Sequence, residues 1–284
     1  MNATPAHSHA LQPFARLTAL LITWNERANI ARTLDRLTWI DRIVAIDSGS
    51  TDGTLEILSS HSNVEVLHRA FDTFADQCNF GLAQIHTPWV LSLDADYGIP
   101  DGLASELPLL LERADHEGLA GFSFRFRYCI DGQPLRGSLL PPRTCLYRRQ
   151  GAHYDNEGHG HRVRLPGPAA PLSLAILHDD RKPLERWLAS QQRYLTIEAA
   201  NLLATPPSAL SRADRLRRHT PLAPLAALIF CLVLRGGLLD GRAGLTYALQ
   251  RSYAELLLLL LLRDQRQRLR PAAAHQAAGK GSGP

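Results

Sequence analysis

Two carboxylates that could hold a divalent cation stand one residue apart, at Asp94 and Asp96. They follow the apolar run 89–93, which is short, rich in strand-forming residues and stopped by a Gly-Ile-Pro turn, so it predicts a buried strand. Both acids then lie at the carboxyl end of that strand, where ligands bind in open α/β sheets. Paired carboxylates at this edge suit a hard cation that bridges to phosphate oxygens. The alternative is that one of them caps the helix expected over residues 102–111.

Polar residues also follow two earlier strands. The strand expected over Leu17–Thr23 ends in Thr23-Trp24-Asn25-Glu26, and the strand expected over residues 42–46 runs into Asp47 and a Gly-Ser-rich turn. Asp, Asn and Glu side chains can accept hydrogen bonds from a ribose or a base, and glycine allows close backbone approach. Taken alone, residues 47–53 could be a plain turn whose Asp52 caps the next helix. Three such loops at successive strand ends favour a binding site.

The elements that must position these loops alternate along the chain. Apolar runs predict the strands, and helical spacing of apolar residues predicts the segments between them. The expected strands cover 17–23, 42–46, 64–67 and 89–93, and the expected helices cover 29–37, 54–60 and 74–84. Strands joined by helical crossovers form a parallel sheet with right-handed connections. The sequence therefore predicts an α/β fold.

Composition narrows the class of protein. The chain has 284 residues, 45% hydrophobic and 20% charged, which is enough for one large domain and an appendage. Its four cysteines form no Cys-x-x-Cys pair, so we expect neither a zinc ribbon nor disulfides but reduced thiols in the cytoplasm. The first fifteen residues hold no Lys or Arg, which argues against a secretory signal. The net charge of +4 is modest, and nucleic acid is not an expected partner.

The segments TWNERANIARTL, IDSGSTDGT and LDADYG, at these spacings, resemble the family 2 glycosyltransferases. These are inverting enzymes with the nucleotide-sugar-binding GT-A fold, a mainly parallel sheet flanked by helices. Within that family the chain is most similar to small bacterial enzymes that build lipopolysaccharide core or related surface glycans. The resemblance extends over residues 17–203.

The resemblance implies roles for individual residues. It assigns donor binding to the polar residues at the three strand ends, namely Thr23, Asn25, Glu26, Asp47 and Asp94. Of these, Asn25, Glu26 and Asp47 would hold the nucleoside, and Asp94 would face ribose or phosphate. Asp96 would ligate Mg²⁺ or Mn²⁺ on the diphosphate. Gln77 and Asn79 match a position that often faces the donor, although they could equally form a solvated helix face.

Inverting transfer also needs a general base for the acceptor hydroxyl, in addition to stabilisation of the departing diphosphate. A polar cluster, residues 154–161, follows the strand-like segment Arg143–Arg148. Many relatives carry a His-Glu pair here, whereas this chain reads Asn-Glu-Gly-His-Gly-His. Glu157 is the first choice of base, followed by Asp155 and His161. The cluster could instead be a Gly-rich surface loop, or His159 and His161 could ligate a metal with Glu157.

Two regions lie beyond this cluster: a polar segment at residues 178–182, and a C-terminal region in which basic and apolar segments alternate. His178, Arg181 and Lys182 either reach a diphosphate or an anionic acceptor, or cap the helix that begins near Pro183.

After the linker at 205, a basic segment (212–219) precedes two apolar ones (222–234 and 256–262), and more arginines follow. Because a bilayer span needs about 20 apolar residues, this pattern favours interfacial helices or a shallow hairpin on an anionic membrane. Ordinary core helices are the alternative.

The predicted organisation is a flexible tail (1–16), a GT-A domain (17–204), a helical membrane-association region (205–270) and a disordered tail (271–284). The predicted function is metal-dependent, inverting transfer of a sugar from a nucleotide-diphosphate donor to a glycan or lipid-linked acceptor in cell-envelope polysaccharide biosynthesis. We expect a peripheral or monotopic enzyme at the cytoplasmic face of the inner membrane. The alternatives are a sugar nucleotidyltransferase, which normally has a Gly-rich first loop where this chain has TWNER, and a non-catalytic nucleotide-sugar-binding module.

Overall fold

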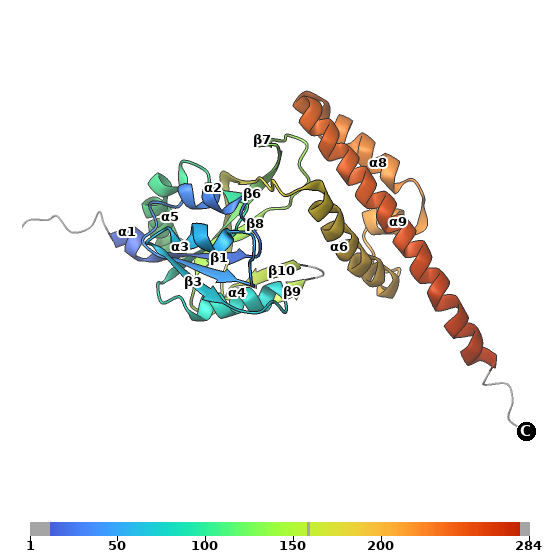
Figure 1. Cartoon of the computed structure of the whole chain (residues 1–284), viewed down its shortest axis with the longest axis horizontal. Coiled ribbons are helices and arrows are strands. Elements are labelled where there is room, and N and C mark those ends of the chain that lie inside the picture. The colour runs from blue at the N-terminus through green and yellow to red at the C-terminus, as the bar shows by residue number, and fades with distance from the viewer. Residues whose placement is uncertain (1–11, 158–159, 279–284) are drawn as a thin grey trace, which may run out of the picture. The chain divides into compact units, whose positions relative to one another are not determined.

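The computed structural model of the chain describes residues 12–157 and 160–278 (Figure 1). The chain forms two compact units. Unit 1 comprises Met1–Pro134 and Ser138–Arg181, and unit 2 comprises Leu135–Gly137 and Lys182–Pro284. The chain therefore crosses between the units at three peptide bonds.

Unit 1 is built on a nine-stranded sheet with the order β3-β2-β1-β4-β8-β6-β11-β5, in which β7 pairs with β6. The strands β1 (Leu17–Thr23), β2 (Ile43–Asp47), β3 (Val64–His68) and β4 (Trp89–Asp94) are parallel, as predicted. The remaining strands are β5 (Tyr97–Gly98), β6 (Gly121–Ile130), β7 (Gln133–Pro134), β8 (Arg143–Arg148) and β11 (Ala169–His178).

The second half of the sheet differs from the mainly parallel sheet that the sequence predicts. β8 runs antiparallel to both β4 and β6, and β5 runs antiparallel to β11, while β6 and β11 are parallel. Among the described residues no helix lies between β6 and β8, and strands joined by a short loop pair antiparallel because a parallel return needs a long crossover. The sheet is therefore mixed, and the fold class is α/β.

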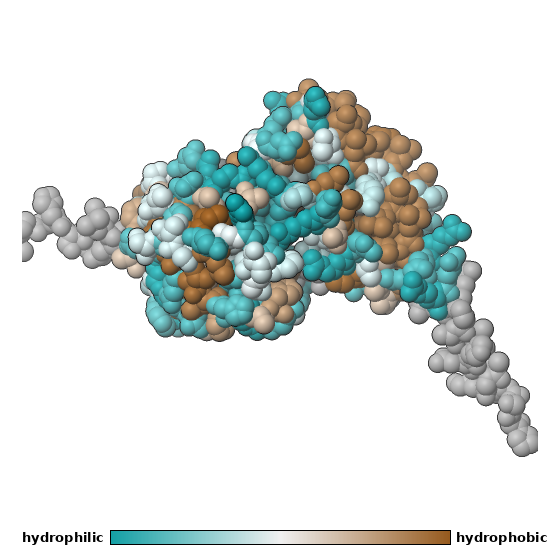
Figure 2. All heavy atoms as spheres, viewed as in Figure 1, coloured by the Kyte–Doolittle hydropathy of each residue, from teal (hydrophilic) through white to brown (hydrophobic). Residues whose placement is uncertain are grey.

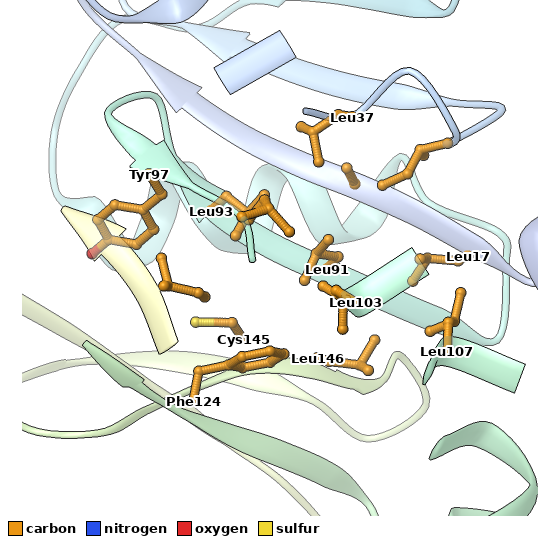
Figure 3. Close-up of a cluster of buried hydrophobic side chains, with 14 of the residues drawn as sticks. Leu17, Leu37, Leu91, Leu93, Tyr97, Leu103, Leu107, Phe124, Cys145 and Leu146 are labelled. Carbon is orange, nitrogen blue, oxygen red and sulfur yellow. The ribbon is translucent and has the colours of Figure 1, made fainter. Parts of the chain in front are cut away.

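Helices cover both faces of the sheet. α2 (Ile30–Asp35), α3 (Thr54–Ser59) and α5 (Leu103–Glu117) contribute to one buried cluster, part of which is drawn in Figure 3. α4 (Phe74–Ala83) packs on the other face through Ala75, Cys78 and Leu82. Adjacent residues of β1, Leu20 and Leu21, belong to opposite clusters because side chains alternate along a strand. Burial on both faces explains the nearly continuous apolar runs of β1 and β2.

Two short elements complete unit 1. α1 (Gln12–Ala15) lies within the segment that the sequence predicts as a flexible tail, and the ring of Phe14 packs edge-on against Trp39 with centroids 5.6 Å apart. β9 (His153–Glu157) and β10 (Gly160–Arg164) form a separate two-stranded hairpin. Gly158 and His159, including half of the predicted His-x-His pair, lie outside the described residues.

Unit 2 is helical. It contains α6 (Leu184–Ala204), α7 (Arg212–His219), α8 (Ala223–Ile229), the π-helical turn η1 (Phe230–Leu234), the 3₁₀ turn η2 (Gly237–Asp240) and α9 (Gly241–Ala278). α6, which the sequence places in the catalytic domain, belongs to this unit because Leu195, Ala199 and Leu202 pack against leucines of α9. α9 continues as helix through the first part of the predicted disordered tail. Within the described residues, Gly237–Arg268 is long and apolar enough to cross a membrane.

The close contact of α4 with the sheet gives a prediction. A Cβ at Gly81 would lie 2.3 Å from Leu20 Cδ1 and 3.1 Å from Ile46 Cγ1. Gly81→Ala should therefore overpack the buried cluster between α4 and the sheet. The free energy of unfolding, measured by urea denaturation, should fall by about 1–3 kcal/mol. The control is Gly167→Ala, whose new Cβ would meet Ala120 Cβ at an ordinary 3.4 Å. Equal stability of the two variants would contradict this packing.

Candidate active site

The carboxyl ends of β1, β2 and β4 bring the three polar loops to one edge of the sheet. Thr23 is in register with Asp47, and Ile22 is in register with Asp94. The strands are neighbours in the sheet, so Thr23 and Asp47 lie at the same level and Asp94 lies one residue away from it. This edge is the ligand-binding edge of an open α/β sheet.

Asp47 holds the loop after β2 together. Its Oδ1 accepts hydrogen bonds from the backbone amides of Gly49 and Ser50, both at 2.8 Å. Its Oδ2 accepts from the hydroxyls of Thr23 (3.0 Å) and Ser50 (2.5 Å). A carboxylate can accept about four hydrogen bonds, so these four bonds occupy all the acceptor positions of Asp47. The Asp47 carboxylate therefore holds this loop in shape, and its contact with a nucleoside stays a prediction.

The loops after β1 and β2 are fastened to each other. The amide of Asn25 donates to Ser50 Oγ (2.7 Å), and the amide of Thr51 donates to Asn25 Oδ1 (2.8 Å). The amide of Glu26 donates to Thr54 Oγ1 at 2.7 Å. Asn25 has φ 55°, a left-handed conformation that asparagine tolerates better than most residues. Two of the three sequence motifs thus form one rigid rim at the sheet edge.

Gln77 and Asn79 hydrogen-bond to other parts of the protein and so do not form the solvated helix face that the sequence leaves open, while their contact with the donor stays a prediction. Gln77 is fully buried, and its amide nitrogen donates to Ser48 Oγ and to the carbonyls of Arg69 and Ala70. Asn79 Nδ2 donates to the carbonyl of Tyr154 (2.9 Å), and Asn79 Oδ1 accepts from the Tyr154 amide (2.8 Å). The first side chain holds the loop before α4, and the second holds strand β9.

Asp96 pairs with His178, which lies near the C-terminal end of unit 1 in the sequence. His178 Nε2 lies 3.1 Å from Asp96 Oδ2, because β11 pairs with β5 and sets His178 opposite Tyr97. The rings of Tyr97 and Tyr128 pack edge-on against the imidazole. Burial lowers the pKa of His178, but the charge of Asp96 and the hydrogen bond to it outweigh this effect, so the pKa is raised. Although the sequence draws attention to His178, it does not connect the residue with Asp96.

Residues of the first motif hold the segment that follows His178. Arg32 Nη1 pairs with Asp179 Oδ2 at 3.0 Å, and Arg32 Nη2 donates to the Asp179 carbonyl at 3.0 Å. Asn29 Nδ2 donates to Asp180 Oδ1, and Asn29 Oδ1 accepts from the Arg181 amide. Both Asn29 and Arg32 belong to the TWNERANIARTL segment. The α2 region therefore fixes the end of β11 and with it the imidazole beside Asp96.

The Asp96 and His178 pair suits a divalent metal. Carboxylate and imidazole are a donor set that Mn²⁺ accepts, and Mg²⁺ sites commonly use one or two protein ligands with substrate phosphates. No cluster of three or more His, Cys, Asp or Glu side chains able to hold a metal exists among the described residues. The remaining ligands would have to come from a bound diphosphate and water. The residues present thus fit a metal that binds together with a nucleotide.

Asp94 and Arg143 place opposite charges beside this pair. No hydrogen-bond donor to the Asp94 carboxylate is found in the described part of the chain, and the side chain is partly exposed. Arg143 Nη1 donates to the hydroxyl of Tyr97 at 3.3 Å. Burial and the charge of Asp94 raise the pKa of Tyr97, so its hydroxyl stays protonated. Arg143 was missed at the sequence level because an arginine at the start of a strand resembles any exposed strand residue.

The hairpin separates the three candidate bases onto two faces. Asp155 and Glu157 lie on the face that carries two arginines, and they pair with Arg164 (3.0 Å) and Arg162 (2.5 Å) respectively. His161 belongs to the other face, with Tyr154 and Val163. Tyr154 is buried, and its hydroxyl donates to Ser92 Oγ on β4 at 2.8 Å. The face of His161 is therefore the one directed toward the central strand.

His161 has the surroundings of a neutral imidazole. Its ring lies 5.3 Å from the ring of Tyr154 and 5.7 Å from that of Phe74. Burial lowers the pKa of His161; Asp94 raises it and Arg143 lowers it, and the net pKa is below the ordinary value. A neutral imidazole near pH 7 can accept a proton. These observations make His161 a candidate base beside Glu157 and Asp155, and the order among the three stays a prediction.

Comparisons with known sequences found a family model and a relative that are similar to this chain. The family model described as "Glycosyl transferase family 2" matches residues 18–165. "Lipopolysaccharide core biosynthesis glycosyltransferase LpsC" of Rhizobium meliloti (strain 1021) is 28% identical over 197 residues, which are 66% of this chain and 72% of LpsC.

Two solved structures are also similar. S. aureus TarS 1-349 in complex with UDP is 15% identical with a TM-score of 0.47, over 88% of this chain and 91% of that chain. Glucosyl-3-phosphoglycerate synthase from Mycobacterium tuberculosis, in complex with Mn²⁺, UDP and glucosyl-3-phosphoglycerate, is 16% identical with a TM-score of 0.43, over 73% of this chain and 88% of that chain.

The contact of Asn79 with the hairpin gives a prediction. Asn79→Ala removes both hydrogen bonds to the backbone of Tyr154, so the free energy of unfolding should fall by about 1–3 kcal/mol. Urea denaturation measures this change, and hydrogen exchange should show faster opening of β9. Asn156→Ala, which changes an exposed residue of the same hairpin, is the control. Unchanged exchange in β9 of Asn79→Ala would show that the hairpin is held by other contacts.

Proposed function

Because the chain belongs to glycosyltransferase family 2, we propose that it transfers a sugar, with inversion, from a nucleoside-diphosphate donor to a glycan or lipid-linked acceptor in cell-envelope polysaccharide biosynthesis. The observation that carries this proposal is the convergence of Asp94, Asp96 and His178 at the carboxyl edge of the parallel strands. The alternative of a sugar nucleotidyltransferase is not supported, because the family model covers the motif loops. The similarity to LpsC supports an envelope glycan as the product.

The donor is proposed to bind at the rim formed by the loops after β1 and β2. Asn25 and Glu26 would contact the nucleoside, and Asp94, which is partly exposed, would face ribose or phosphate. Thr23 and Asp47 would keep the rim in shape through their mutual hydrogen bond of 3.0 Å. Arg143 supplies a positive charge near the departing diphosphate.

Asp96 and His178 are proposed to hold Mg²⁺ or Mn²⁺ together with the diphosphate. When bound, such a cation neutralises negative charge on the leaving group. Arg32 and Asn29 would keep the imidazole oriented toward Asp96 through Asp179 and Asp180. A rigid pair of ligands positions the donor without rearrangement during transfer.

His161 is the proposed general base. A neutral imidazole beside Asp94 would take the proton of the acceptor hydroxyl while that oxygen attacks the anomeric carbon and the bond to the diphosphate breaks. The charge of Asp94 stabilises the imidazolium that forms, as it already raises the pKa of His161 against the effect of burial. Phe74 and Tyr154 limit the rotation of the ring.

The proposed location is the cytoplasmic face of the inner membrane, as a peripheral or monotopic protein. Nucleotide sugars and reduced thiols both belong to the cytoplasm, and the described cysteines are buried and unpaired. One apolar helical stretch supports membrane association. Screening nucleotide sugars for protection against thermal unfolding, with and without Mn²⁺, tests the donor class directly.

The first prediction here concerns the metal. Asp96→Asn keeps the size of the side chain but removes its charge, so kcat should fall about 10²–10³-fold. Binding of Mn²⁺ in the presence of the donor nucleotide, followed by electron paramagnetic resonance of free Mn²⁺, should weaken as well. Asp101→Asn is the control, because that side chain is 93% exposed and pairs only with Arg36 among the described residues. Full activity in excess EDTA would exclude a metal.

The second prediction concerns the base. His161→Gln should lower transfer about 10²–10⁴-fold while donor affinity stays close to that of the wild type. His153→Gln, an exposed histidine of the same hairpin, is the control. Glu157→Gln and Asp155→Asn should keep most of their activity. If Glu157→Gln is the inactive variant, the original order of candidates is right and His161 is not the base.

The pH profile distinguishes the two partly buried histidines, His161 and His178. The base must be neutral, and the pKa of His161 is lowered, so kcat/KM should stay high as pH falls to 6.5 and decline only below it. This decline should disappear in whatever activity remains in His161→Gln. A decline with its midpoint above 6.5 would instead point to His178, whose pKa is raised.

A further inference from the structure

One face of α9 is apolar and exposed. Its members are Leu245, Leu249, Tyr253, Leu256 and Leu260, which are 41–55% exposed. They are spaced by three or four residues and therefore lie on one side of the helix. We call this set the α9 stripe.

The opposite face of α9 is committed to unit 2. Leu258 and Leu262 are buried against α6. Glu255 is 8% exposed and pairs with Arg217 at 2.9 Å, and Arg217 also pairs with Glu198 at 2.9 Å. Arg251 lies 3.7 Å from Glu255 on the same side. α9 is thus apolar on one side and tied into a charged network on the other.

A second exposed row continues the apolar surface on the neighbouring helix. α8 packs against α9. The exposed apolar residues of α8 and η1, with Leu222 just before α8, are Leu222, Leu225, Ile229, Phe230, Val233 and Leu234. Figure 2 shows hydrophobic residues gathered over this part of the chain. Exposed apolar surfaces of this extent mark sites of interaction.

The basic charge of residues 182–284 indicates an anionic partner. Residues 182–284 contain fifteen Lys or Arg but only six Asp or Glu, although the whole chain has a net charge of only +4. Arg242 and Arg263 are exposed and stand just beyond the two ends of the α9 stripe. Leucines next to arginines match a surface that offers acyl chains beneath anionic headgroups. A second copy of the same basic unit would instead be repelled.

We propose that α9 lies in the plane of an anionic phospholipid bilayer, with the α9 stripe in the acyl-chain boundary and its flanking arginines on lipid phosphates. A spanning orientation would need an apolar surface on every side of the helix, whereas Arg251 and Glu255 lie in the same part of α9 as the α9 stripe, on the opposite side. This inference refines the proposed location. It does not depend on the proposed reaction, since it rests on unit 2 alone.

Binding of the full chain to vesicles tests the surface. The wild type should cosediment with vesicles of phosphatidylcholine and phosphatidylglycerol, much less with phosphatidylcholine alone, and less at high salt. Leu249→Gln combined with Leu256→Gln should weaken binding about tenfold or more. The control is Leu55→Gln with Leu109→Gln, two exposed leucines of unit 1. Equal binding of both double variants, or a wild-type dimer in light scattering that only the α9 variant abolishes, would overturn the proposal.

Labelling of the helix ends tests the orientation. Arg242→Cys and Gln267→Cys each place one exposed thiol beyond one end of the α9 stripe. The native cysteines are buried, and the wild-type protein gives the background labelling. After the protein binds to sealed vesicles, an impermeant maleimide should label both variants, because an in-plane helix keeps both ends outside. Labelling of only one variant until detergent is added would show that α9 spans the bilayer. Unchanged thermal unfolding confirms that each variant is folded.

Discussion

The hydrogen bonds of the buried Asp47 carboxylate hold the loops on which the site is built. Burying a carboxylate is costly unless donors satisfy it, and two backbone amides and two hydroxyls do so here. Through Thr23 and Ser50 these bonds join the ends of β1 and β2. The loop after β1 leads into α2, and Asn29 just before this helix and Arg32 within it hold the end of β11. One charged group thus supports a chain of contacts that ends at His178 and Asp96.

The hairpin β9–β10 depends on a different kind of anchor. An isolated two-stranded hairpin is marginal in water, so it needs contacts with other elements to keep one orientation. Asn79 mimics a strand partner by pairing with both backbone groups of Tyr154, and the Tyr154 hydroxyl reaches β4. With this face held, the ion pairs of Asp155 and Glu157 remain on the other face. The anchor therefore decides which polar side chain meets the central strand.

Local patterns predicted the first half of the fold because each strand there is a short apolar run. β1 has the predicted bounds, and β4 is one residue longer. The sequence could not predict the pairing of Asp96 with His178, because these residues are 82 positions apart and meet only through the β11–β5 ladder. It also could not rank Glu157 and His161, because a shift of one residue in strand register exchanges the two faces. Gln77 reads as a surface residue, but the loop before α4 folds over it.

The division into two units separates the chemistry from the proposed attachment. His178 stands four residues before Lys182, where the chain passes into unit 2. A second passage occurs at residues 135–137, where Asp240 Oδ2 accepts hydrogen bonds from the amides of Arg136 and Gly137 within unit 2. Short covalent links of this kind keep the two units at a high effective concentration. If unit 2 rests on a bilayer, these covalent links keep unit 1 tethered to the same membrane.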